Sequence, residues 1–204
     1  MITSMCKQYD KTIVITNRSL VHGDFLKQIE YVINLHPHAV ILREKDLTDE
    51  AYEELAERIS KLCRKEGVRC FLHSRIEIAQ SLGCRNIHLP LEALVAMEEQ
   101  KLIKLKEFFQ EISVSCHGLE DVELAIAMGA TQIVLGTIFE TECKKGLKGK
   151  GIDFVREICR RCPIPVYAIG GVNMERLSLL LEAGAAGGCM MSGFMQLRAE
   201  DGYL

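Results

Sequence analysis

"LEDVELAIAMGATQIVLGTIF", residues 119–139, contains the repeated unit that decides the fold. Its first part has the pattern of a helix and ends at Gly129, and an apolar, β-branched run begins at Gln132. The same order of helix, glycine and strand occurs in the segments whose helices end at Gly83 and Gly184. Three such repeats indicate consecutive βα units.

Short apolar runs alternate with helical segments along the whole chain. In residues 49–65, Tyr52, Leu55 and Ile59 share one helical face, and Thr48 is expected to cap the helix. The short runs are apolar on both faces, which is typical of parallel strands covered by helices. They are residues 12–17, 39–44, 69–74, 86–90, 111–117, 132–139, 165–171 and 187–193.

Eight strands with intervening helices in 204 residues predict an α/β fold, a (β/α)8 TIM barrel forming a single domain over residues 1–204. An open doubly wound sheet is the competing architecture, but it would ordinarily have fewer strands or a longer chain. In a barrel, the functional groups lie at the C-terminal ends of the strands and in the loops that follow them. The search for a site is thereby confined to those positions.

The composition excludes several classes of partner. A formal net charge of −3 argues against a nucleic acid or an anionic membrane as the main partner. No run approaches the ~18 apolar residues that span a bilayer. Nine cysteines, an odd number scattered along the chain, fit a reduced cytoplasmic protein better than a disulfide framework.

Two glycine-rich segments follow the last two predicted strands. "AIGGV" (168–172) and "MMSG" (190–193) lie where barrels commonly bind phosphate through backbone N–H groups. Glycine suits such a site because a Cβ atom would hold the anion away. Gly170, Gly171, Met191 and Ser192 are therefore predicted to bind a phosphate, the alternative being that the glycines only form tight turns.

The end of the second strand carries a basic pair. Alternation of side chains along a strand puts Arg43 and Lys45 on one side and Glu44 on the other. Two cations at a barrel mouth suit a second anion, such as a carboxylate or a diphosphate. The alternative is a solvated ion pair at the rim.

His117 follows the fifth strand and is predicted to be a general acid or base, since histidine readily exchanges protons near neutral pH. Ser115 at the same strand end is expected to contact the substrate. Alternation directs Cys116 away from His117, so no Cys–His dyad follows from adjacency. His22, His36, His38 and His88 are interpreted as structural.

"FETECKKGLKGKG", residues 139–151, follows the sixth strand and matches neither of the glycine-rich nucleotide motifs. It is predicted to act as a lysine-bearing loop over the barrel mouth. Thr141 and Lys144 are the substrate-binding candidates in this loop.

Seven motifs together resemble the thiamine phosphate synthase/TenI superfamily, whose members are TIM barrels of about this length. One branch joins a pyrimidine diphosphate to a thiazole phosphate, and the other, the TenI-type thiazole tautomerase, aromatises a thiazole carboxylate phosphate. The resemblance extends from the second strand to the eighth. The motifs are "LREKDLT", "HSR", "IHLP", "SVSCHGLEDVELA", "TIFETECKKGLKGKG", "YAIGGV" and "GAAGGCMMSG".

Departures from the synthase pattern favour the tautomerase branch. Synthases carry magnesium-binding aspartates where this chain has Ser74 and Ala93, although Glu92 is adjacent, and a glutamine where it has Ile41. Mg²⁺ prefers carboxylate oxygen ligands, which serine and alanine cannot supply. The loop at 139–151 also looks like that of the tautomerases.

The resemblance therefore implies, first, a metal-independent isomerase that acts on a small phosphorylated thiazole. His117 would move the proton, and Arg43, Lys45 and Lys144 would hold the carboxylate or stabilise charge. No cofactor is expected, and Mg²⁺ only in a synthase. The alternatives are thiamine phosphate synthase and a non-catalytic regulatory protein that binds a phosphorylated ligand. A homodimer is expected by analogy with the superfamily.

Overall fold

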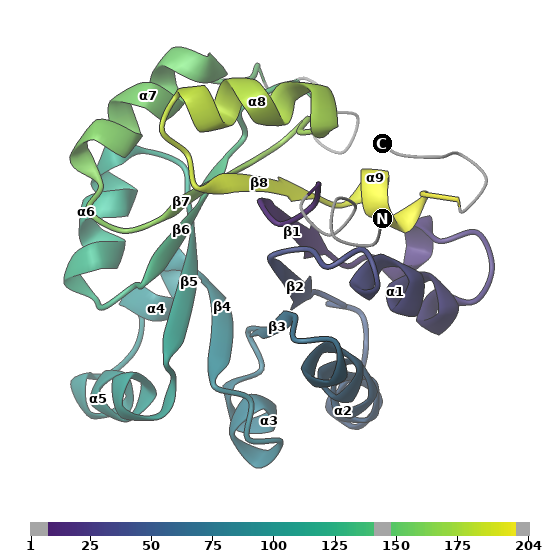
Figure 1. Ribbon diagram of the computed structural model, residues 1–204. Helices are drawn as coiled ribbons and strands as arrows, with labels where there is room; N and C mark the ends of the chain where they lie inside the picture. Colours follow the sequence, from purple (N-terminus) through teal and green to yellow (C-terminus); the bar gives the residue numbers. More distant parts are fainter. Residues whose placement is uncertain (1–7, 141–147, 199–204) are drawn as a thin grey trace.

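Eight parallel strands close into a barrel in the computed structural model of the protein, which describes residues 8–140 and 148–198 (Figure 1). Each strand pairs with the next along the chain, and β8 pairs with β1. The predicted fold is confirmed, with strands somewhat shorter than the apolar runs. They are β1 (Thr12–Ile15), β2 (Ala39–Leu42), β3 (Arg69–His73), β4 (Asn86–Pro90), β5 (Glu111–Cys116), β6 (Gln132–Gly136), β7 (Val166–Ile169) and β8 (Gly187–Met190).

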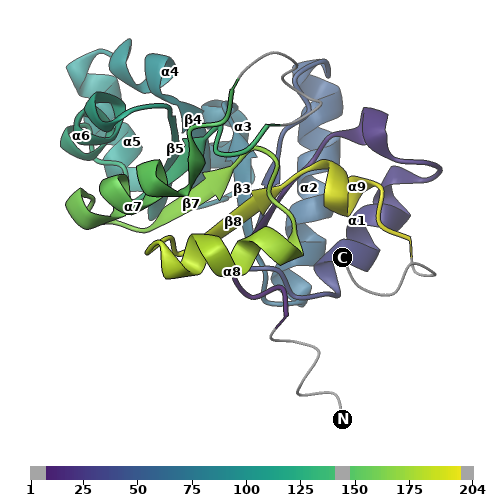
Figure 2. The same cartoon turned by 90° about the horizontal axis from the view of Figure 1, so that it is seen from above.

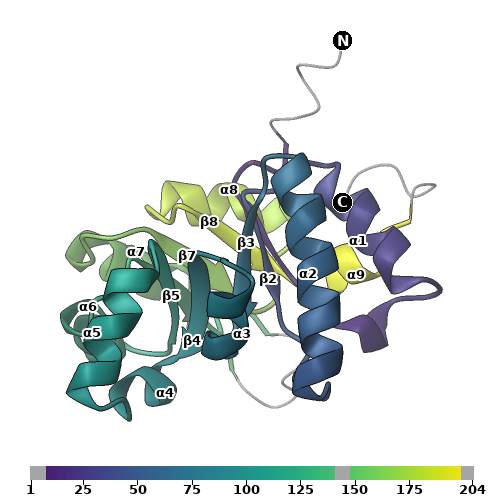
Figure 3. The same ribbon diagram turned by 90° about the horizontal axis from the view of Figure 1, so that it is seen from below.

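Helices surround the strands on the outside (Figures 2 and 3). No helix in the described part of the chain is long and apolar enough to cross a membrane. The helices are α1 (Phe25–Ile33), α2 (Asp49–Lys65), α3 (Ile76–Ser81), α4 (Leu91–Val95), α5 (Glu99–Phe108), α6 (Leu119–Ala127), α7 (Gly151–Arg161), α8 (Met174–Glu182) and α9 (Ser192–Met195), with a 3₁₀ turn, η2 (Arg18–Leu20).

The three glycines that were expected to end helices do so. Gly83, Gly129 and Gly184 follow α3, α6 and α8 with φ angles of +65°, +99° and +96°. At each of them the next residue donates its N–H to a carbonyl five residues earlier in the helix, at 2.8 to 3.0 Å. This closing bond requires the left-handed conformation that glycine adopts without strain, and it turns the chain back toward the next strand.

Apolar side chains form two separate cores because successive residues of a strand point to opposite faces. The outer core lies between strands and helices and contains, for example, Ile87, Leu89 and Cys116. The smaller inner core fills the barrel and contains Ile13, Ile15, Ala39, Ile41, Phe71, Val134, Tyr167 and Cys189. The residue two positions beyond the last inward side chain of each of these strands reaches the C-terminal end of the barrel, which we call the mouth.

A single hydroxyl joins α2 to two strands. Thr48 caps α2 as predicted, accepting a hydrogen bond from the Ala51 N–H, and Tyr52 follows in the first turn. The Tyr52 hydroxyl donates to the carbonyl of Leu42 at 2.7 Å and accepts from the N–H of His73 at 3.0 Å. Because Tyr52 is 1% exposed, no solvent can replace these two bonds.

Replacing Tyr52 by phenylalanine is therefore expected to lower the free energy of unfolding by roughly 1–3 kcal/mol, because a buried C=O and a buried N–H lose their common partner. Urea denaturation of the two proteins measures the difference. The half-buried Tyr31→Phe variant is the matched control and should change stability by less than about 0.5 kcal/mol. Equal losses in both variants would contradict the role given to the Tyr52 hydroxyl.

Candidate active site

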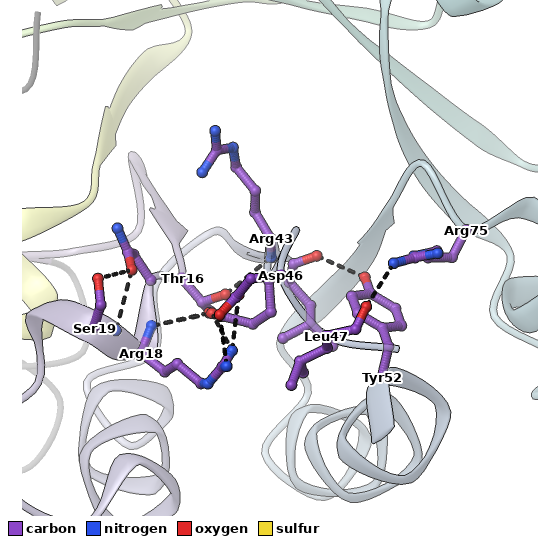
Figure 4. Close-up of polar contacts among 11 residues, drawn as sticks. Thr16, Arg18, Ser19, Arg43, Asp46, Leu47, Tyr52 and Arg75 are labelled. Atoms are coloured by element: carbon purple, nitrogen blue, oxygen red, sulfur yellow. Dashed lines mark hydrogen bonds and ion pairs between the residues drawn. The ribbon is translucent and has the colours of Figure 1, made fainter. Parts of the chain in front are cut away.

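Two cationic side chains follow β2. The N–H of Arg43 donates to Thr16 Oγ1 at 2.9 Å, which holds this strand end against β1. The Arg43 guanidinium extends away from the neighbouring polar network (Figure 4). Neither it nor the Lys45 ammonium pairs with a carboxylate of the described residues. Within residues 8–140 and 148–198, no carboxylate therefore competes with an anionic ligand for these two cations.

Glu44, between these cations, turns to the other side as alternation requires. It is 3% exposed and accepts the N–H of Arg18 through both oxygens, at 3.1 and 3.2 Å. The Arg18 guanidinium lies 3.7 Å from it and is also bonded to Asp46 at 2.6 and 2.9 Å (Figure 4). The carboxylates beside β2 are thus already paired, and they do not neutralise Arg43.

Two buried histidines lie side by side where β3 and β4 reach the mouth. The rings of His73 and His88 are 5.5 Å apart, and the residues are 8% and 4% exposed. Burial, followed by the charges of Arg43 and Lys45, lowers the pKa of His73 to about 4. Burial, with smaller contributions from His73 and Arg43, lowers the pKa of His88 to about 3. Both rings are therefore neutral at pH 7.

Ser115 lies on β5 beside these rings and is tied to His88. Its hydroxyl is 2.9 Å from Nε2 of His88, and the hydroxyl of Ser113 is 2.8 Å from Nδ1. Ser113 is fully buried, whereas Ser115 is half-buried. Cys116 points outward into the core, and burial raises its pKa to about 12, so it is no nucleophile.

His117 is exposed and follows β5 directly. Its Nδ1 lies 2.8 Å from the carbonyl oxygen of Gly136 on β6. A carbonyl only accepts, so Nδ1 carries a proton, and in the neutral form of the ring Nε2 carries the lone pair. Asp121 accepts the His117 N–H at 2.7 Å, and the Lys150 ammonium donates to the His117 carbonyl. The bond from Nδ1 orients the ring, the other two hold its backbone, and no described residue bonds Nε2.

The glycine turn after β7 is shaped by close contacts. Gly170 and Gly171 have φ angles of +100° and +61°. A Cβ atom on Gly171 would lie 2.6 Å from the carbonyl oxygen of Glu140. Arg176 of α8 donates to the Gly171 carbonyl at 2.6 Å, with its guanidinium 4.7 Å from the centre of the Phe139 ring. The turn therefore requires glycine and has a fixed shape.

The predicted site residues largely meet at this end of the barrel. Met191 packs against the inner core, and Ser192, which is exposed, opens α9. Arg43 lies close enough to affect the pKa of both buried histidines. The predicted residues Thr141 and Lys144 lie outside the described residues.

His73 and His88 were not selected as site residues from the sequence. Both belong to the predicted runs. His73 lies an even number of positions from an inward residue of its strand, and His88 lies between Ile87 and Leu89, whose side chains point outward. His73 is two residues beyond the inward Phe71. Strand parity was therefore the signal that could have placed them in the mouth.

The described residues do not fit a magnesium ion held by the protein. His73, Ser74 and Pro90, at the ends of β3 and β4, offer no carboxylate, and Glu92 is exposed on α4. Among the described residues, no group of three His, Cys, Asp or Glu side chains could hold a metal. Mg²⁺ takes oxygen ligands, typically carboxylates, so a protein-held ion would lack its usual partners here.

Comparison with known proteins identifies the family. The family model described as thiamine monophosphate synthase matches residues 12–194. The chain belongs to the thiamine monophosphate synthase family. Two thiamine-phosphate synthases in this family, from Coprothermobacter proteolyticus and Fusobacterium nucleatum, are 30% and 28% identical to it. The alignments cover 91% and 93% of this chain and 87% and 89% of those proteins.

A solved structure has the same fold. The thiamine phosphate pyrophosphorylase from Pyrococcus furiosus superposes with a TM-score of 0.79 at 23% identity, over 94% of this chain and 90% of that one. At this identity the likeness concerns the fold alone. It agrees with the closed eight-stranded barrel described above.

These findings correct the first functional interpretation. The tautomerase prediction was wrong, because the relatives matched over nearly the whole chain are named thiamine-phosphate synthases. It depended on a few substituted positions and on a loop whose residues 141–147 lie outside the described part of the chain. The family itself was predicted correctly, and family membership supports an enzyme, while the motifs did not distinguish the branch.

The neutral histidines make stability depend on pH. The pKa values of His73 and His88 in the folded protein, about 4 and about 3, lie below the ordinary value of 6.5. At a pH between the folded and the ordinary values, the unfolded chain therefore binds more protons than the folded protein does. The stabilisation is complete above pH 6.5 and declines as the pH falls. We expect a loss of roughly 1–2 kcal/mol per histidine from pH 7.5 to pH 5 in urea denaturation.

The His73→Gln and His88→Gln variants should each show a smaller difference between the two pH values than the parent, since each removes one of these protonation sites. A parent protein that is equally stable at pH 7.5 and pH 5 would contradict the neutral state of both rings.

Proposed function

We propose that this protein is a thiamine phosphate synthase, a transferase that joins hydroxymethylpyrimidine diphosphate to a thiazole phosphate. The observation that carries the proposal is the match to synthases over nine-tenths of the chain, at 28% and 30% identity. The mouth agrees with it, because Arg43 and Lys45 stand without carboxylate partners among the described residues. An enzyme whose two substrates both carry phosphate needs such uncompensated cations.

In this reaction the thiazole ring nitrogen forms a bond to the methylene carbon of the pyrimidine, and the carbon–oxygen bond to the diphosphate breaks. The diphosphate leaves with the bonding electrons, so negative charge develops on its oxygens. Groups that stabilise this charge accelerate the step. We assign this role to Arg43 and Lys45, with Lys144 as a further candidate from the loop.

The thiazole phosphate is assigned to the glycine turn after β7 and the segment after β8. Gly170, Gly171, Met191 and Ser192 would supply backbone N–H groups there. The fixed shape of the turn supports this assignment, because Arg176 and the close approach of Glu140 hold it in place. Ser115 and Thr141 remain candidates for contact with the pyrimidine diphosphate.

His117 takes a different role from the one first expected. Formation of the new bond and departure of the diphosphate transfer no proton from a ring carbon, so the step needs no general base. We assign its free Nε2 to a hydrogen bond with the substrate. His117→Ala is expected to lower kcat/KM by about 10-fold, the value of one hydrogen bond, and not by the ~10²–10⁴ of an acid–base catalyst.

The protein's own cations would stabilise the charge of the diphosphate, because the described residues do not fit a protein-held Mg²⁺. No step of the reaction is assigned to a metal.

Purified protein incubated with hydroxymethylpyrimidine diphosphate and thiazole phosphate is expected to form thiamine phosphate and diphosphate in equal amounts. Arg43→Met should lower kcat/KM by about 10²–10³, the usual cost of losing one group that stabilises developing charge. Arg160→Met on the outside of α7 removes the same charge far from the mouth and should leave the rate unchanged. Binding of the substrates without product, with or without added Mg²⁺, would overturn the proposal in favour of a binding protein.

A further inference from the structure

His88 is held at the centre of a small polar network in the mouth. In the sheet it is paired with His73 on one side and Ser113 on the other. Its backbone carbonyl accepts the N–H of Ser74 at 3.0 Å. Its side chain is 4% exposed, and both ring nitrogens are within 2.9 Å of a serine hydroxyl on β5. The ring therefore cannot turn without breaking two hydrogen bonds.

Because the His88 ring is neutral, its hydrogen bonds to Ser113 and Ser115 run in different directions. Burial and the nearby Arg43 keep His88 neutral, as described above. A neutral imidazole has one N–H and one lone pair. One serine must therefore accept a hydrogen bond from the ring, and the other must donate to it.

The burial of Ser113 decides which serine donates. Its side chain is fully buried, and His88 Nδ1 is the hydrogen-bond partner of its hydroxyl among the described residues. If Nδ1 carried the proton, the Ser113 O–H would have no acceptor, at a cost of about 1–3 kcal/mol. Ser113 therefore donates to Nδ1, and Nε2–H donates to the oxygen of Ser115.

We infer that His88 is a positioning residue that leaves the O–H of Ser115 free to donate into the mouth, toward a hydrogen-bond acceptor of the pyrimidine diphosphate. The identity of this ligand rests on the proposed function. The acceptor is a diphosphate oxygen or a ring nitrogen of the pyrimidine, since both are hydrogen-bond acceptors. Half-buried Ser115 is the member of the network that such a ligand can reach.

The tautomer is measured directly by ¹⁵N NMR of the histidine side chains in the wild-type protein at pH 7, with the His88→Gln variant assigning the signals. We expect a protonated Nε2 and an unprotonated Nδ1. A protonated Nδ1, or a ring protonated on both nitrogens, would overturn the inference. This measurement needs no turnover, so its result is independent of whether thiamine phosphate is formed.

Binding of inorganic diphosphate and of hydroxymethylpyrimidine, measured separately by calorimetry, tests the free hydroxyl and identifies its acceptor. Ser115→Ala should raise the Kd of one of these two probes by about 10-fold. Ser113→Ala removes only the donor to Nδ1. If the tautomers then become equally populated, the Kd rises about 2-fold and the ¹⁵N signals shift toward average values.

Two substitutions of His88 distinguish a residue that positions the Ser115 hydroxyl from one that only fills space in the core. His88→Gln can still accept from Ser113 and donate to Ser115, whereas His88→Leu can do neither. We expect Gln to bind the affected probe nearly as wild type does, and Leu to resemble Ser115→Ala. Equal affinities in the two variants, or an unchanged Kd for both probes in Ser115→Ala, would overturn the inference. If His88→Leu does not fold, the tautomer seen by ¹⁵N NMR and the Kd values of Ser113→Ala and Ser115→Ala still test the inference.

Discussion

Alternation of side chains along eight parallel strands is the constraint on which the site of this protein depends. All strands of the closed barrel run the same way, so their C-terminal ends meet at one mouth. The inward parity of β2, β3, β4 and β5 then brings Arg43, His73, His88 and Ser115 together from four separate elements. A shift of one residue in β4 would exchange His88 with Ile87 or Leu89 and move an aliphatic side chain into the mouth.

The electrostatics of the mouth follow from which groups lack a countercharge. The protein carries a net charge of −3, yet the carboxylates nearest to Arg43 are turned away and bonded to Arg18. Burial and the charge of Arg43 keep the neighbouring histidines neutral. The mouth thus combines positively charged Arg43 and Lys45 with neutral imidazoles and hydroxyls. The neutral groups can serve as oriented hydrogen-bonding groups.

The barrel was predictable because its signals are local and repeated. Apolar runs, helical periodicity and the glycines at positions 83, 129 and 184 each report on a few neighbouring residues, and together they required eight βα units. Arg43, His117 and the two glycine-rich segments could be assigned to the mouth on the same grounds. The serine–histidine network could not, because the direction of its bonds depends on burial and on contacts between residues 25 or more positions apart.

The branch of the family was harder to predict, for a chemical reason. Tautomerase and synthase both bind a phosphorylated thiazole, so both need a glycine-rich phosphate site and cations in the mouth. Replacement of carboxylates by Ser74 and Ala93 bears on metal binding, but it does not remove the ability to hold diphosphate where unpaired cations remain. The free Nε2 of His117 suits a proton acceptor and a hydrogen-bonding partner equally well. The short motifs therefore indicated that the ligand is anionic, but they did not indicate the reaction. Similarity to relatives over the whole chain was needed for that.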